Sequence, residues 1–233
     1  ALALALLGPP AIEATAPPDR PQDAPDLEAA ARLIQNTCFA LHPADRIARM
    51  SGQAGPAPES VSVEPLEQIR FLRTEDPLEK GLYYPALLPD LLPAFRVHLV
   101  PGRTFLDLGS GDGRVVFLAA VMGTRPTGIE YDHGLHRIAR TARRRLRDSL
   151  PITGIRLVRG DFFETDYGAW DILFYYAAGS YAEKRLGEKL ADEMRCEARL
   201  LVYGGLSDLF PRLRFAGSIG GVQEFRREEG CPR

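Results

Sequence analysis

Hydrophobic and polar positions follow two alternating patterns from residue 103 onward. Short apolar runs of strand length alternate with longer stretches in which apolar residues recur at helical spacing. Strands are expected at residues 103–108, 125–130, 154–160, 169–176 and 197–203, and helices at 114–122, 133–150 and 181–194. Strands that alternate with helices of this length predict βαβ units. We therefore expect an α/β fold, with a mostly parallel sheet and helices on both faces.

The pattern changes on either side of this region. Two more strands, at 213–217 and 222–228, flank the glycine pair 220–221 and predict an antiparallel hairpin that closes one edge of the sheet. The apolar stretch 86–100 is expected to be helical in pieces, because Pro89 and Pro93 interrupt it. The complete expectation is a mostly parallel seven-stranded sheet with a C-terminal antiparallel hairpin.

The N-terminal part of the chain lacks this alternation. Residues 1–25 are rich in proline and alanine, which favours a disordered leader, either a low-complexity segment or the remnant of a signal or membrane anchor. Asp26 can cap a helix that starts at Leu27, so residues 26–60 are expected to form a helical extension followed by a linker. Residues 61–233 are expected to form the functional domain.

Composition and charge narrow the function classes. The 233 residues are 45% hydrophobic and 26% charged, an ordinary globular balance, with a formal net charge of −2. This charge gives no strong nucleic-acid signal, because nucleic-acid binders usually carry a basic excess. The arginine-rich run at 137–147 is interpreted as a solvated helix face, with contact to an acidic partner or an anionic lipid as the alternative. The three cysteines have no metal-binding spacing and suggest no disulfide framework, so no metal site is expected and the thiols are taken as buried or incidental.

The strongest functional signal is the sequence FLDLGSGDGRVVFLAA at residues 105–120. An acid, Asp107, stands near the end of a strand, a glycine-rich turn follows, and a helix opens. Glycines allow positive φ angles and let the backbone approach a ligand closely. The helix N-terminus supplies amide donors and a partial positive charge. The loop therefore predicts a site for a nucleotide phosphate or an amino-acid-like group.

The spacing of the glycines separates these two ligand classes. In the dinucleotide fingerprint a third small residue stands three positions after the second glycine, but that position holds Arg114. Asp107 would repel a pyrophosphate, whereas it would attract a cationic ammonium. S-adenosylmethionine (SAM) carries an ammonium and a sulfonium and no phosphate. The loop therefore favours SAM over a nicotinamide cofactor.

This stretch resembles motif I of the class I SAM-dependent methyltransferases, and the resemblance continues across roughly residues 70–205. It implies a Rossmann-like fold and SAM as the cofactor. Glu130 matches the family acid that accepts hydrogen bonds from the ribose, and Asp161 matches the acid that accepts from the adenine amino group. The resemblance implies a cofactor site made of Asp107, Gly109, Ser110, Gly111, Asp112, Gly113, Glu130, Tyr131, Asp161 and Phe162.

Within this class, the segments LDLGSGDGRVV and RTEDPLEKGLYYPALL are similar to the small lysine methyltransferases of mitochondrial inner-membrane proteins and their bacterial relatives. They are more distantly similar to the non-SET histone-lysine methyltransferases. This resemblance implies methyl transfer to a nucleophile, either a protein lysine or a small molecule. The fourth strand lacks the Asn-Pro-Pro-Tyr signature of other amino-methylating enzymes, so no catalytic residue is assigned. Tyr84 and Tyr176 are the acceptor-side candidates, because aromatic walls suit a methylated ammonium.

Three hypotheses therefore stay open. The leading one is a SAM-dependent methyltransferase in the cytoplasm, where its cofactor is made, with membrane contact only through an N-terminal anchor. The second is a nicotinamide- or nucleotide-binding Rossmann enzyme. The third is a SAM-binding module without catalytic activity.

Overall fold

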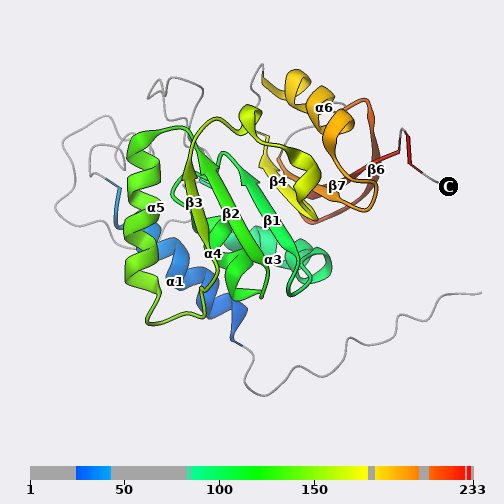
Figure 1. The fold of residues 1–233 in the computed structure, drawn as a ribbon. Helices are drawn as coiled ribbons and strands as arrows, with labels where there is room; N and C mark the ends of the chain where they lie inside the picture. The colour runs from blue at the N-terminus through cyan, green and yellow to red at the C-terminus, as the bar shows by residue number, and fades with distance from the viewer. Residues whose placement is uncertain are drawn as a thin grey trace, which may run out of the picture.

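Seven strands form one sheet in the part of the chain that the computed structural model describes, which is residues 25–42, 83, 85–177, 182–204, 210–228, 230 and 231. Their order is β3-β2-β1-β4-β5-β7-β6 (Figure 1). The parallel strands are β1 (Thr104–Leu108), β2 (Arg125–Glu130), β3 (Arg156–Arg159), β4 (Ile172–Tyr176) and β5 (Arg199–Tyr203). β6 (Leu213–Ile219) and β7 (Val222–Arg227) form an antiparallel hairpin, and β7 also pairs antiparallel with β5. The expected Rossmann-like sheet with a C-terminal hairpin is confirmed.

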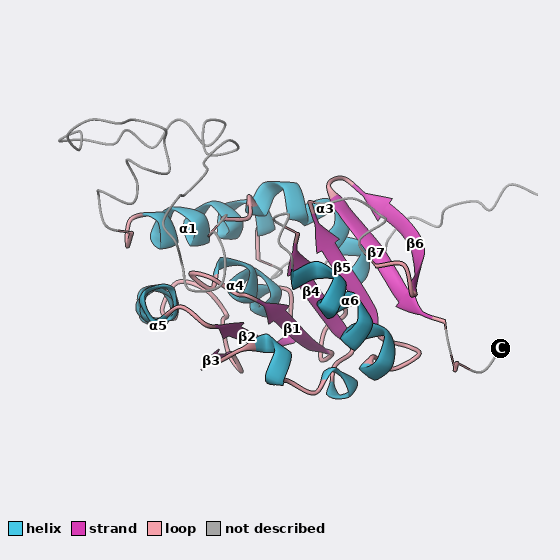
Figure 2. Cartoon of the chain, turned by 90° about the horizontal axis from the view of Figure 1, so that it is seen from above, coloured by secondary structure: helices cyan, strands magenta, loops and turns pink. Residues whose placement is uncertain are grey.

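Side chains of the central strands alternate between two hydrophobic cores. Phe105 and Phe174 belong to the core that packs against the N-terminal helices, whereas Leu106 and Leu173 belong to the core under α6 (Ala182–Glu193). Successive side chains of a strand point to opposite faces of the sheet. Because a core covers each face, these strands are apolar on both sides. Figure 2 shows α1 and α4 on one side of the sheet and α6 on the other. The helices that contribute to the first core are α1 (Leu27–Phe39), α3 (Leu88–His98), α4 (Arg114–Val121) and α5 (His133–Leu146).

Helix α1 is packed into the first core. Asp26 caps it by accepting hydrogen bonds from the amides of Glu28 and Ala29, at 3.0 and 3.1 Å, as the sequence predicted. Ile34 is fully buried, and the side-chain oxygen of Gln35 accepts from the first amide of α3 at 3.0 Å. That amide has no partner within its own helix, so α1 satisfies it. Residues 1–24 of the leader expected at 1–25, and the linker expected at 51–60, lie outside the described residues.

Helix α3 is continuous, so the expectation of separate helical pieces is wrong. Pro89 stands in the first turn, where amides have no intrahelical partner, and a proline costs little there. Pro93 lies in the middle of the helix, where it removes one intrahelical hydrogen bond without ending the helix. Burial of Leu91, Leu92 and Phe95 then holds the helix together. None of the helices in the described ranges is both long and apolar enough to cross a bilayer.

Two of the three cysteines form a disulfide, so the expectation of incidental thiols is wrong for them. Cys196 follows α6 and Cys231 follows β7, with Cα atoms 5.5 Å apart. The antiparallel hairpin returns the C-terminal segment to the turn between α6 and β5, and Arg227 reinforces this contact by donating to the carbonyl of Met194 at 2.8 Å. The pairing depends on this long-range path and has no local signature. Cys38 is a free, buried thiol.

Candidate cofactor site

The glycine loop lies at the point where the order of the strands reverses. β1 is bonded to β2 on one side and to β4 on the other, so successive crossovers diverge from its carboxyl end. Open α/β sheets bind ligands in the crevice at such a point, beyond the carboxyl ends of the strands. The loop at 109–113 connects β1 to the N-terminus of α4. The motif found in the sequence therefore occupies the position where this fold forms a ligand site.

The loop requires glycine for both conformation and space. Gly109, Gly111 and Gly113 all have positive φ angles, of 82°, 55° and 84°. A Cβ atom on Gly111 would stand 2.5 Å from a ring carbon of Tyr83, a distance that no real Cβ contact tolerates. The amides of Gly109 and Ser110 donate to the carbonyl of Ile129 at 3.0 and 2.9 Å, which fixes the start of the loop against β2.

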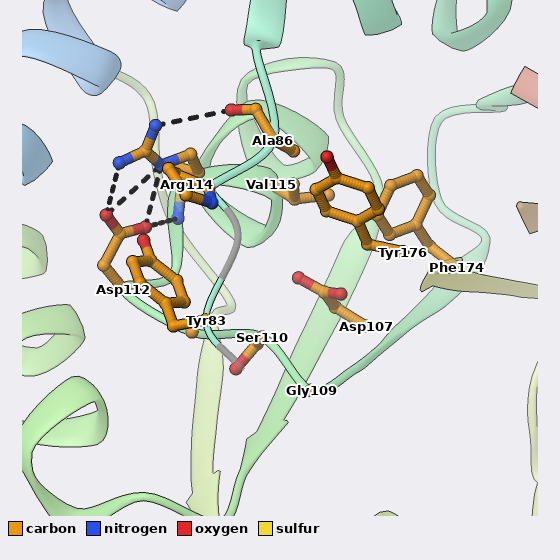
Figure 3. Close-up of a pocket in the computed structure, with 12 residues that line it drawn as sticks. Tyr83, Ala86, Asp107, Gly109, Ser110, Asp112, Arg114, Val115, Phe174 and Tyr176 are labelled. Atoms are coloured by element: carbon orange, nitrogen blue, oxygen red, sulfur yellow. Dashed lines mark hydrogen bonds and ion pairs between the residues drawn. The ribbon is translucent and has the colours of Figure 1, made fainter. Parts of the chain in front are cut away.

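Asp107 is a buried carboxylate at the centre of the site. Its side chain belongs to β1, the residue is 3% exposed, and its Oδ2 atom has no hydrogen-bond partner among the described residues. Burial raises the pKa of this carboxyl well above its usual range, and the nearby carboxylates of Glu130 and Asp112 raise it further. Figure 3 shows the Asp107 carboxylate among the side chains that line the pocket. A cation placed there would satisfy the oxygen and restore the charged form of the acid.

Glu130 is the last residue of β2, and its carboxylate links the glycine loop to the loop that follows β2. Its carboxylate accepts hydrogen bonds from the amides of Gly111 and Asp132, each at 2.7 Å. Burial raises its pKa, while these two amides pull the pKa in the opposite direction. A carboxylate has about four acceptor positions. Glu130 can thus hold the glycine loop in place and still accept from a ligand.

Asp112 is engaged in a buried cluster below the loop. Its carboxylate receives the Arg114 guanidinium, with contacts of 2.6 to 3.2 Å, and lies 3.1 Å from Nε2 of His42 (Figure 3 draws the arginine contacts). Arg114 also donates to the carbonyl of Ala86 at 3.3 Å. Burial alone would raise the pKa of Asp112, but Arg114 and His42 outweigh it and hold the pKa well below its usual range. Because this side chain is occupied, any contact of Asp112 with a cofactor would come from its backbone.

The two residues expected on the adenine side lie at the end of β3. Asp161 caps the 3₁₀ turn η2 (Phe162–Glu164) and accepts from the amide of Phe163 at 3.0 Å. The Phe162 ring comes within 4.0 Å of the position that a Cβ on Gly109 would occupy, so it faces the glycine loop. Tyr131 is 38% exposed beside Glu130. Their roles in cofactor binding stay predictions, but the fold does bring these residues to the same edge of the sheet.

Comparison with known proteins supports the same assignment of fold. A model of the family described as the histone methylation protein DOT1 matches residues 82–172. A curated relative from Caenorhabditis elegans, named as a lysine N-methyltransferase of an ATP synthase subunit, is 37% identical over 98 residues, which are 42% of this chain and 49% of the relative. The chain thus spans about half the length of the curated relative that it matches.

Solved structures are similar over most of the sheet. The RNA methyltransferase of Salinibacter ruber, in complex with S-adenosyl-L-homocysteine, is 24% identical with a TM-score of 0.52, and the match covers 64% of this chain and 96% of that one. A mutant of MtNAS is 18% identical with a TM-score of 0.53, covering 87% of this chain and 76% of that one. The same mutant in complex with SAM has a TM-score of 0.50 at 17% identity, covering 87% and 78%. The chain therefore has the Rossmann-like fold of the class I SAM-dependent methyltransferases.

A small open pocket lies between the glycine loop and the residues that precede α3. Tyr176 lines it, and its ring packs 5.0 Å from that of Tyr203, while Tyr84 lies outside the described residues. The sequence had placed an acceptor site here only through the tyrosines. The lining residues from Asp107 to Asp112 belong to the predicted cofactor site, whereas Pro85, Ala86, Val115 and Phe174 had no signal of their own in the sequence. The pocket is lined by Tyr83, Pro85, Ala86, Asp107, Gly109, Ser110, Gly111, Asp112, Arg114, Val115, Phe174 and Tyr176.

Proposed function

We propose that this protein is a SAM-dependent methyltransferase and that its methyl acceptor is a lysine side chain of another protein. The observation that carries the cofactor assignment is Asp107, a buried carboxylate with an unpartnered oxygen at the switch point of the sheet. An anion such as a pyrophosphate would be repelled there, whereas the ammonium of an amino acid moiety would be attracted. The small residues of the neighbouring loop leave room for such a group.

The residues on this edge fit SAM from end to end. Asp107 and the backbone of the loop at 109–113 would hold the methionine part. Glu130, with Tyr131 beside it, would accept from the ribose, and Asp161 with Phe162 would hold the adenine. Bound SAM supplies a methyl group that its sulfonium already activates, so the protein needs mainly to position the acceptor and exclude water.

A lysine acceptor must be neutral before its amine can attack. A pocket that removes water lowers the pKa of an ammonium and so favours the neutral amine. The pocket has aromatic walls in Phe174 and Tyr176, which also suit a methylated ammonium. The relative named as a lysine N-methyltransferase, at 37% identity, supports the same acceptor class, and so does the DOT1 family match. We assign no general base, because methyl transfer of this kind needs none with a defined position.

Two other functions make different predictions. A nicotinamide enzyme would have a small residue in place of Arg114 and no buried acid facing a pyrophosphate. An inactive SAM-binding module would bind the cofactor and transfer nothing. Cofactor binding therefore separates the first alternative from our proposal, and turnover separates the second.

The first experiment is calorimetric titration of the chain with SAM, S-adenosylhomocysteine and NAD. We expect the two adenosyl ligands to bind and NAD to give no heat. Glu130→Ala should abolish binding, whereas Glu197→Ala, which removes an exposed glutamate from the turn before β5, should leave it unchanged. Thermal unfolding of each variant without ligand controls for loss of structure. A folded wild-type chain that binds neither adenosyl ligand would refute the cofactor assignment.

The acceptor is tested with radiolabelled SAM and paired substrates. We would offer a lysine-containing peptide from the ATP synthase protein that the curated relative is named for, and the same peptide with arginine in place of lysine. Transfer only to the lysine peptide would support the acceptor class. Tyr176→Phe keeps the aromatic wall and should retain transfer, whereas Tyr176→Ala should reduce it by about tenfold or more. Cofactor binding without transfer to any lysine substrate would favour the inactive module.

A further inference from the structure

Arginines gather on one exposed surface at an edge of the sheet. They come from helix α5, its C-terminal cap and the neighbouring strand β3, which is the last strand on that side (Figure 1). We call this surface the arginine face. Its members, all exposed, are Arg137, Arg140, Arg143, Arg144, Arg145, Arg147 and Arg159.

The apolar side of α5 is used by the protein itself. Leu135, Ile138 and Leu146 are buried, and the helix packs against α1, β2 and β3. The opposite side of the helix, about 21 Å long for its 14 residues, therefore presents its arginines outward. A helix held in this way cannot insert into a membrane, but it can lie against a charged surface.

The positive charge of the arginine face is almost uncompensated. Residues 133–160 contain a single acidic residue, Asp148. Within the described ranges, Arg147 is the one member of the face whose guanidinium lies within ion-pair distance of a carboxylate, at 3.2 Å from Asp148. The chain as a whole has a formal charge of −2, so this concentration is a local feature.

All the lysine and arginine positions of this segment are arginines. The guanidinium is a planar fork that binds phosphate oxygens in pairs, which the ammonium of lysine does not do. Clusters of four to eight basic residues on an amphipathic helix are typical of proteins that bind anionic lipids. Single-stranded nucleic acid is usually bound by stacking on aromatic rings, and residues 133–160 contain no Phe, Tyr or Trp.

We propose that the arginine face binds an anionic phospholipid surface. The contact is electrostatic, between guanidinium groups and lipid phosphates and carboxylates, without insertion of the helix. α5 begins three residues after Glu130, so the membrane contact would lie on the helix that directly follows the proposed cofactor site in the sequence. Lipid binding of this kind is independent of catalytic activity.

The test is co-sedimentation of the full chain with vesicles. One set contains phosphatidylcholine with about 30% phosphatidylserine and the other only phosphatidylcholine, at about 0.1 M salt. The variant Arg140→Gln with Arg144→Gln removes two charges from one side of α5. The control, Arg212→Gln with Arg214→Gln, removes two exposed arginines beside β6, at the opposite edge of the sheet.

We expect binding to the anionic vesicles only, and loss of it at about 0.5 M salt. Each arginine near an anionic surface contributes roughly a fivefold factor, so the α5 variant should bind about thirtyfold more weakly. The control should change by less than about threefold, although it loses the same net charge. Thermal unfolding shows whether each variant is folded.

Three results would overturn the proposal. They are equal binding to neutral vesicles, an equal loss in both double variants, and tighter binding to a single-stranded RNA oligonucleotide than to the anionic vesicles in the same buffer. The last result would assign the face to nucleic acid instead.

Discussion

The buried contact between Asp112 and Arg114 gives the sharpest prediction about stability. Their side chains are 1% and 3% exposed, and their charged atoms approach to 2.6 Å. Asp112→Asn keeps the shape of the side chain and removes its charge. The guanidinium of Arg114 would then be buried beside a neutral amide. We expect a large loss of stability from this single change, because the remaining charge has no carboxylate to compensate its lost hydration.

The expected loss in the free energy of unfolding can be estimated from the cost of breaking other buried ion pairs. Removing one partner of such a pair costs about 3–5 kcal/mol, and native domains are stable by about 5–15 kcal/mol in total. In a domain of this size each kcal/mol lowers the melting temperature by roughly 2–4 °C. The variant should therefore melt roughly 6–20 °C lower than the wild type.

Urea unfolding followed by circular dichroism measures this loss directly. The matched control is the double variant Asp112→Asn with Arg114→Met, which removes both charges. It should be more stable than Asp112→Asn alone by about 1 kcal/mol or more, because no charge is left unpaired. A loss below about 1 kcal/mol in the single variant, or simple additivity in the double variant, would refute the account of a tightly coupled pair.

The difference in the free energy of unfolding between wild type and Asp112→Asn should change with pH in one direction. The folded pKa of Asp112 is held below its unfolded value, so its contribution is fully present above about pH 4 and is lost as the pH falls. The gap between wild type and Asp112→Asn should therefore stay constant from about pH 5 to 8 and shrink in more acidic solution.

Three further changes have separate physical causes. Gly111→Ala should cost about 1–3 kcal/mol in thermal unfolding, because its Cβ would stand 2.5 Å from the Tyr83 ring, whereas Gly154→Ala has a similar positive φ with open space and should cost about 1 kcal/mol. Equal losses would contradict the steric explanation. Cys231→Ser opens the disulfide and should cost about 2–4 kcal/mol in urea, as should a reducing agent in the wild type. A wild type that is indifferent to the reducing agent would contradict this. Affinity for SAM should rise as the pH rises through the raised pKa of Asp107, because this acid must be charged to hold an ammonium. Asp107→Asn should bind at least about tenfold more weakly and without this slope, and a slope that persists would assign the titration to another group.

The sheet could be predicted because its signals are local. Each strand shows as an apolar run of its own, and the glycine turn before α4 identifies where the ligand site begins. Glu130 could also be predicted, because it is the last residue of β2, the next strand in the sequence. The continuous helix α3 was missed because Pro89 stands at the helix start, where it costs little, and because burial of Leu92 and Phe95 holds the helix together across Pro93.

Contacts between distant segments had no such signal. His42 reaches Asp112 across 70 residues, and the sequence places it in no motif. The disulfide joins residues 35 apart through the return of the C-terminal hairpin. Disulfides persist in oxidising compartments and are rare in the cytosol. This bond is therefore an observation against the expectation of a cytoplasmic location.

Asp107 and Asp112 stand five positions apart in the sequence but have different roles in the site. Asp107 and Asp112 are both almost completely buried, and burial alone would raise the pKa of each. Asp112 turns toward Arg114 and His42, which keep it charged and hold α1 against the loop. Asp107 has two neighbouring carboxylates and forms no ion pair with a cation of the described residues, so we expect a bound ligand to compensate its charge. The same residue type is thus structural at one position and available for binding at the other, because of where the neighbouring charges lie.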